Sequence, residues 1–68
     1  MNRAAFLRHL KAYCRSAGVE YRFDAAHGKA GHGRVYVGGA FTTVKSGEIS
    51  NTMKQLLLKQ LGLPKDAF

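Results

Sequence analysis

Two histidines and three glycines lie within one short segment, residues 27–33, whose sequence is HGKAGHG. Glycines on both sides of His32 would let the backbone approach a bulky ligand closely, and an imidazole can give or take a proton near neutral pH. Lys29 and Arg34 flank the same position and can pair with phosphate. The residues predicted to contact RNA are Arg22, Lys29, Gly31, Gly33, Arg34 and Lys45.

Together these residue types suit cleavage of RNA without a metal ion or another cofactor. His32 would take up the proton of the 2′-hydroxyl or protonate the leaving 5′-oxygen, while nearby cations stabilise the charged phosphorus centre. DNA would resist this route because it lacks the 2′-hydroxyl as an internal nucleophile.

The same segment allows other interpretations. Residues 28–31 match the GXXG pattern with which KH domains clamp a nucleic-acid backbone, but that motif joins two helices, whereas strands are predicted on both sides here. His27 and His32 would supply at most part of a zinc site, because Cys14 lies far away and no CxxC or HExxH spacing is present. Lone loop histidines are mostly solvated bystanders, and His9 is expected to be simply exposed.

The first element that positions this segment is a predicted helix over residues 2–16. Its apolar residues recur at helical spacing: Phe6, Leu10, Tyr13 and Ala17. Gly18 follows where a left-handed residue commonly ends a helix, and Cys14 is expected to be a small core residue.

A second helix is predicted to begin near Ser50 or Asn51, either of which can cap it. Its expected inward residues are Ile49, Met53, Leu56, Leu57 and Leu61. Gly62 supplies the ending, with Leu63 packing back on Leu58 and Pro64 preventing continuation.

Three strands are predicted between the helices, over residues 19–23, 34–37 and 40–44, with Gly38-Gly39 as a tight hairpin turn. The connections are short, so the sheet should be antiparallel. The predicted fold is therefore α+β in the order α-β-β-β-α, with both helices on one face of a three-stranded sheet. The other face would present Glu20, Arg22, Arg34 and Tyr36 to water. This layout is that of double-stranded RNA-binding domains, an analogy of fold alone.

Length and charge limit the classes of function. The 68 residues suffice for one domain, residues 1–68, of which 64–68 form a short tail. Eleven Lys and Arg against four acids give a net charge of +7, which favours nucleic acid or an acidic protein as partner, or else only keeps the domain soluble. The core is small, so the free protein is expected to be a monomer or a weak dimer.

No apolar run approaches the roughly 20 residues of a membrane span. No signal peptide is expected, and a lone cysteine fits the cytoplasm.

Three stretches of the chain, residues 28–36, 41–44 and 53–63, resemble the HicA-like toxins of bacterial toxin–antitoxin systems. That resemblance implies an mRNA interferase, a ribosome-independent endoribonuclease with a fold similar to a double-stranded RNA-binding domain. It also implies that the family histidine corresponds to His32 and that the partner is a HicB-like antitoxin. One difference is Ala30-Gly31, where the family often has Gly-Ser before its histidine, so a hydroxyl is missing there.

Two further hypotheses remain beside the toxin. The first is a non-catalytic RNA-binding module that uses the same wet face of the sheet. The second is a structural or adaptor domain whose positive charge binds an acidic protein.

Overall fold

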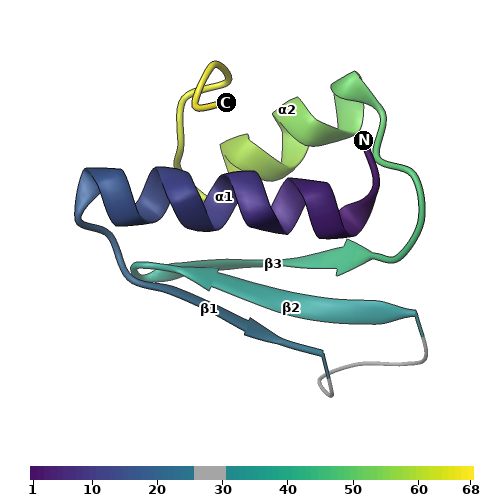
Figure 1. Cartoon of the computed structure of the whole chain (residues 1–68), viewed down its shortest axis with the longest axis horizontal. Coiled ribbons are helices and arrows are strands. Elements are labelled where there is room, and N and C mark those ends of the chain that lie inside the picture. The colour runs from purple at the N-terminus through teal and green to yellow at the C-terminus, as the bar shows by residue number, and fades with distance from the viewer. Residues whose placement is uncertain (26–30) are drawn as a thin grey trace.

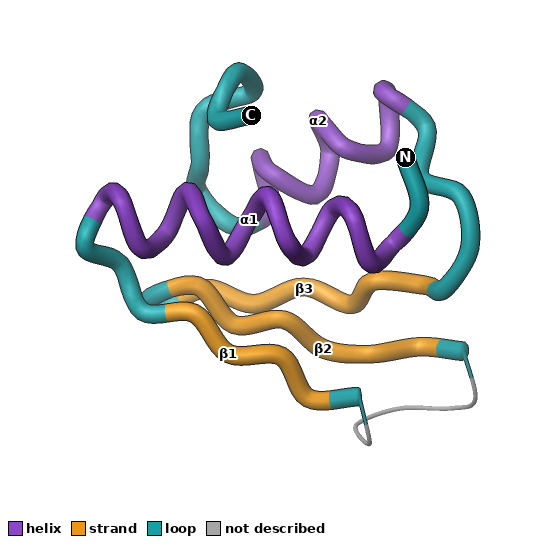
Figure 2. Tube along the Cα trace, in the orientation of Figure 1, coloured by secondary structure: helices purple, strands orange, loops and turns teal. Residues whose placement is uncertain are grey.

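The computed structural model describes residues 1–25 and 31–68. Its elements follow the predicted order and form an α+β fold (Figure 1). They are α1 (Arg3–Ala17), β1 (Tyr21–Asp24), β2 (His32–Val37), β3 (Ala40–Lys45) and α2 (Asn51–Gln60). Both helices lie on the same side of the sheet, as predicted (Figure 2). The likeness to double-stranded RNA-binding domains stays a prediction.

The sheet is antiparallel, with the strands in the order β1-β2-β3. β2 begins earlier than predicted, because His32 pairs with Lys45 and Gly33 pairs with Val44. These two positions and Lys45 were expected to lie in loops, and the cross-strand ladder draws them into strands instead. β1 begins two residues later than predicted, because the N–H of Val19 is hydrogen-bonded to the carbonyl of Cys14 at the end of α1.

Both helices begin at a capping side chain. Asn2 Oδ1 accepts a hydrogen bond of 2.8 Å from the backbone N–H of Ala5, and Ser50 Oγ accepts one of 3.1 Å from that of Met53. Each cap satisfies a backbone donor that the first helical turn leaves unpaired, and such caps typically contribute about 1 kcal/mol.

Both helices also end with the predicted glycine. After α1, the N–H of Val19 donates to the carbonyl of Cys14 at 2.8 Å. After α2, the N–H of Leu63 donates to the carbonyl of Leu58 at 2.9 Å, with Gly62 between them. These bonds of Schellman type satisfy carbonyls that would otherwise lack partners.

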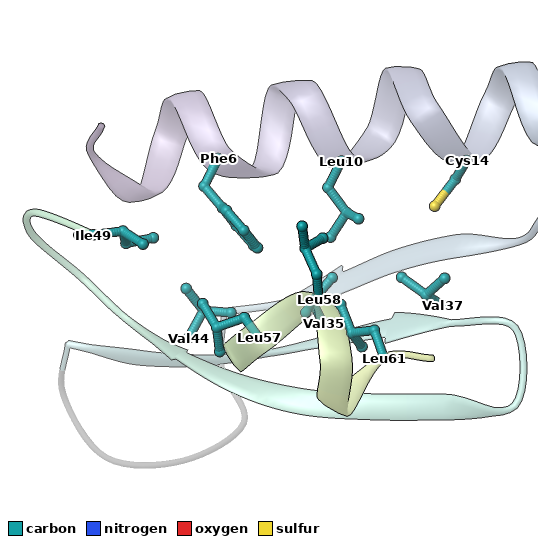
Figure 3. Close-up of a cluster of buried hydrophobic side chains, with 10 residues drawn as sticks. All are labelled: Phe6, Leu10, Cys14, Val35, Val37, Val44, Ile49, Leu57, Leu58 and Leu61. Carbon is teal, nitrogen blue, oxygen red and sulfur yellow. The ribbon is translucent and has the colours of Figure 1, made fainter. Parts of the chain in front are cut away.

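The hydrophobic core fills the space between the helices and the sheet (Figure 3). Its buried members are Phe6, Leu10, Cys14, Val35, Val37, Val44, Ile49, Leu57, Leu58 and Leu61. Cys14 is fully buried, as predicted, and continues the stripe of Phe6 and Leu10. Ala17 was expected on that stripe and is instead exposed, because it lies at the last turn of α1, beyond the edge of the core.

The inward face of α2 differs from the predicted one. Met53 and Leu56 were expected to face the core, but they are 45% and 48% exposed. Leu58 was not expected there and is fully buried. Consecutive leucines occupy more than one side of the helix, so the packing of α2 on β3 and beside α1 decides which of them are covered.

The last residues return over the helices. The N–H of Ala67 donates to the carbonyl of Pro64 at 3.1 Å, which closes one turn. The ring of Phe68 meets that of Phe6 edge to face, with centroids 5.5 Å apart, and its backbone oxygen accepts a bond of 2.8 Å from Lys54 Nζ. In the part of the chain that is described, neither helix is long and apolar enough to cross a membrane.

Candidate functional site

The face of the sheet that the helices leave uncovered carries most of the predicted site. Along β2, Gly33, Val35 and Val37 are buried, while the residues between them are only half-buried. Because side chains alternate along a strand and cross-strand partners point to the same side, the register assigns the uncovered residues. We call this surface the open face. Its residues are Arg22, Asp24, His32, Arg34, Tyr36, Phe41, Thr43 and Lys45.

Four side chains of the open face contact one another in sequence. The guanidinium carbon of Arg22 lies 4.3 Å from the ring centroid of Tyr36, its cross-strand partner. That of Arg34 lies 4.7 Å from the ring centroid of Phe41. The two rings are 5.9 Å apart and tilted by 39°. Arg22, Tyr36, Phe41 and Arg34 thus form a continuous set of cation–π and aromatic contacts, which we call the cation–aromatic row.

Phe41 is the member of this row that the sequence analysis missed. It is 53% exposed, an unusual position for a large apolar ring. The signal was present in the alternation of β3, where Phe41 shares its face with Thr43 and not with the buried Thr42 and Val44.

His32 lies at the start of β2, one cross-strand pair beyond Arg34 of the cation–aromatic row. It is half-buried, and its cross-strand partner is Lys45, at the last position of β3. A groove of about 340 Å³ opens beside it. The lining residues are His32, Thr43, Val44, Lys45, Ser46, Glu48, Ile49, Met53 and Leu57. An imidazole and an ammonium group border this groove, and Met53 and Leu57 of α2 line it as well, so it extends to the helix side of the sheet.

Packing on the helix side of the sheet fixes the start of β2. A Cβ atom at position 33 would lie 2.7 Å from Cε1 of Phe23 and closer still to Cζ, so the ring occupies the space that only glycine leaves free. The guanidinium carbon of Arg3 lies 5.3 Å from the centroid of that ring. Gly33 therefore has a packing role behind His32, and its predicted contact with RNA stays a prediction.

The turn before β2 is fixed by the carbonyl of Gly31. That oxygen accepts a hydrogen bond of 2.6 Å from the N–H of Ser46 and one of 3.5 Å from Arg3 Nη1. Gly31 has φ +83°, which side chains rarely adopt, and a Cβ atom there would lie 3.2 Å from Ser46 Oγ. The glycine preceding His32 is thus required by the turn itself.

The predicted site residues are partly brought together. Arg22, His32, Arg34 and Lys45 share the open face. Gly31 and Gly33 lie on either side of His32 in the chain, at the turn and on β2. His27 and Lys29 lie outside the described residues, as does most of the GXXG match.

The remaining candidate residues lie elsewhere. His9 is exposed, as predicted, and its ring stacks on that of Phe68 with centroids 5.7 Å apart. Burial raises the pKa of the Cys14 thiol. Burial also raises the pKa of the Tyr21 hydroxyl, and the charge interaction with the nearby Cys14 raises it further. Both groups lie on the helix side of the sheet. Within residues 1–25 and 31–68, no three His, Cys, Asp or Glu side chains gather into a metal site.

Comparison with family models, with curated proteins and with solved structures finds no match to this chain. What can be inferred about its function therefore comes from the residues of the open face and from the groove beside His32.

Proposed function

We propose that this protein is an endoribonuclease that cleaves mRNA and so blocks translation, with His32 as the acid–base group. One observation carries this proposal: His32 shares the open face with Arg22, Arg34 and Lys45. Lys45 is the cross-strand partner of His32, and Arg34 lies two residues along β2. An imidazole beside cations that can pair with phosphate suits metal-free cleavage of RNA. The net charge of +7 agrees with a polyanionic substrate.

The chemistry uses the 2′-hydroxyl of the RNA as nucleophile. A bond forms between the 2′-oxygen and phosphorus while the bond from phosphorus to the 5′-oxygen breaks. The products are a 2′,3′-cyclic phosphate and a free 5′-hydroxyl. His32 takes the proton from the 2′-hydroxyl or gives one to the 5′-oxygen, and solvent water exchanges the other proton. Lys45, its cross-strand neighbour, stabilises the negative charge that develops on the phosphate oxygens.

The biological setting follows from the HicA-like resemblance of the sequence. In this proposal the protein is the toxin of a toxin–antitoxin pair and acts in the cytoplasm, where mRNA is translated. Its protein partner is a HicB-like antitoxin that covers the open face. Such a partner would present carboxylates to Arg22 and Lys45, which are both exposed.

The test is a pair of histidine variants. His32→Ala should lower the rate of RNA cleavage by about 10²–10⁴-fold, the usual contribution of a positioned acid–base group. His9→Ala is the matched control, because His9 lies on α1 and away from the open face. The products should carry cyclic phosphate ends and form equally well with a chelator present. Unchanged cleavage and toxicity in His32→Ala would refute the assignment of His32.

A second function, RNA binding without cleavage, is favoured by a separate observation. The cation–aromatic row needs no titratable group to bind nucleic acid, since rings and guanidinium groups suffice for stacking and phosphate contact. In that case RNA would remain intact after long incubation with the wild-type protein, while its affinity would fall with rising salt. A denaturing gel separates the two functions.

A further inference from the structure

We infer that the cation–aromatic row binds unpaired RNA bases, that Phe41 is the surface on which a base stacks, and that the substrate is single-stranded RNA. This inference rests on the proposed RNA-directed function but not on catalysis by His32. It differs from what the fold analogy with double-stranded RNA-binding domains would suggest.

The Phe41 ring is in contact with its neighbours and still open to solvent. The guanidinium carbon of Arg34 lies 4.7 Å from its centroid and the Tyr36 ring centroid lies at 5.9 Å, yet 53% of the residue is exposed. A ring that is held by neighbours and open to solvent can accept a base with little loss of side-chain entropy. Aromatic rings bind unpaired bases in this way with little dependence on sequence, because every base has a stacking face.

Cations outnumber carboxylates on this surface. The described strands place Arg22, Arg34 and Lys45 on the open face with one carboxylate, Asp24. Glu20, just before β1, lines a hollow together with Arg22 and Tyr36. The guanidinium groups of Arg22 and Arg34 lie against aromatic rings, and a guanidinium in such a contact can still donate from its N–H groups to phosphate oxygens beside a stacked base. An exposed ring among cations therefore fits a nucleic acid better than an apolar protein surface.

The open face continues from the cation–aromatic row to His32. Three successive cross-strand pairs lie along the open face: Tyr36 with Phe41, Arg34 with Thr43, and His32 with Lys45. Phe41 and Lys45 are four residues apart on β3, about 13 Å at the usual rise of a strand. A strand of RNA stacked on Phe41 can thus extend over Arg34 and bring a phosphodiester a few nucleotides away to His32.

Duplex RNA does not fit this arrangement. Its bases are already stacked on one another, and its deep, narrow major groove keeps side chains from their edges. In a complex with duplex RNA, the cation–aromatic row would contribute only phosphate contacts, and no base would stack on the Phe41 ring. We therefore expect the nucleotides on one side of the cleaved bond to be unpaired.

The chain contains no tryptophan, so Phe41→Trp places a single reporter in the row. We expect a short unstructured 2′-O-methyl RNA, which cannot supply the nucleophile for cleavage, to quench the emission of this tryptophan. A blunt duplex of equal length should quench it far less. Leu56→Trp is the matched control, because Leu56 is similarly exposed at 48% but lies on α2; its emission should not change. Equal quenching by single strand and duplex would overturn the inference.

Phe41→Leu measures the contribution of the ring while keeping an apolar side chain. Its affinity for the same single strand should fall by roughly 5- to 150-fold, the range of one base stack, and Phe41→Tyr should restore it. The dependence of affinity on salt should stay unchanged in Phe41→Leu, whereas Lys45→Ala should reduce the salt slope by about one phosphate contact. Unchanged affinity in Phe41→Leu would overturn the inference.

The outcomes separate this inference from the proposed function. If the RNA binds but the emission of Phe41→Trp and the affinity of Phe41→Leu both stay unchanged, base stacking is refuted while the proposal of RNA cleavage by His32 is unaffected. If no RNA binds at low salt, both are refuted. If Phe41→Leu abolishes self-association and leaves RNA affinity unchanged, the row is a protein contact and the inference is refuted.

Discussion

Replacing Gly33 with alanine tests how the start of β2 is held in place behind His32. The added Cβ would lie 2.7 Å from Cε1 of Phe23 and closer still to Cζ, whereas ordinary van der Waals contact begins at 3.4 Å, so the ring must move by more than about 0.7 Å. The guanidinium carbon of Arg3 lies 5.3 Å from the ring centroid, so a shift of the ring also alters that contact. Overpacking of this kind typically costs about 1–3 kcal/mol.

The clash and the backbone effect of this substitution change the stability in opposite directions. Gly33 has no positive φ, so alanine is allowed by the backbone and without the clash would stabilise the protein by about 0.4–1 kcal/mol through the unfolded state. We expect the clash to prevail. Thermal unfolding followed by circular dichroism should show the melting temperature of Gly33→Ala falling, by roughly 4–8 °C per kcal/mol in a domain of this size. Gly39→Ala is the control, since a Cβ at that position meets nothing within 4 Å.

A double-mutant cycle identifies the cause. In a Phe23→Leu background the ring is gone, so Gly33→Ala should become neutral or stabilising there. Stabilisation by Gly33→Ala in the wild-type protein, or an equal loss in both backgrounds, would show that the Phe23 ring does not require the glycine.

Two other substitution experiments follow from the core. Leu58→Ala should destabilise the protein by about 2–5 kcal/mol, because Leu58 is fully buried. In so small a domain that loss should leave much of the chain unfolded. The control is Leu56→Ala, at an exposed position, which should change the free energy of unfolding by no more than about 0.5 kcal/mol in chemical denaturation. Burial holds the pKa of the Cys14 thiol above its ordinary value of 9.0. The folded state favours the neutral thiol, so its contribution to the free energy of unfolding is fully present below pH 9.0 and is lost as the pH rises through the raised pKa. Alkylation of Cys14 by iodoacetamide should proceed only at the rate of unfolding. Rapid alkylation of the native protein would contradict the burial of Cys14.

Local sequence signals predicted most of the fold because the chain follows local rules at nearly every element. The capping residues Asn2 and Ser50 and the glycines after each helix fix where the helices begin and end, and these features depend on neighbouring residues alone. The Gly38-Gly39 turn fixes which strands pair. Once the order was known, the alternation of β2 was enough to assign Arg34 and Tyr36 to the open face.

The errors arose where long-range contacts decide the structure. The periodicity of α2 allows more than one inward face, and its contacts with β3 and α1 select Leu58 over Met53 and Leu56. Likewise, nothing local indicates that Gly33 belongs to a strand. Its place depends on pairing with Val44, eleven residues away in sequence, and on the ring of Phe23, ten residues away.

The candidate site was predicted in part for the same reason. His32 stood out because of its chemistry and its glycines, and the cations stood out because of their charge. Phe41 did not stand out, because one aromatic residue in an apolar strand is normally core. The alternation of β3 allows Phe41 on the open face, and the structure adds its contacts: the register sets it beside Tyr36, and its ring centroid lies 4.7 Å from the Arg34 guanidinium carbon.

The alternation of β2 allows stability and function to be tested separately. Gly33 and Val35 face the core, so substitutions there act on the melting temperature first. His32 and Arg34 face the opposite side, so substitutions there should act on RNA with little effect on folding. The two sets interleave residue by residue on one strand. We expect an open-face substitution to abolish cleavage and leave the melting temperature unchanged. We expect a substitution at the adjacent core-facing residue to lower the melting temperature and leave cleavage unchanged. This pair of results would support both the register and the proposed site.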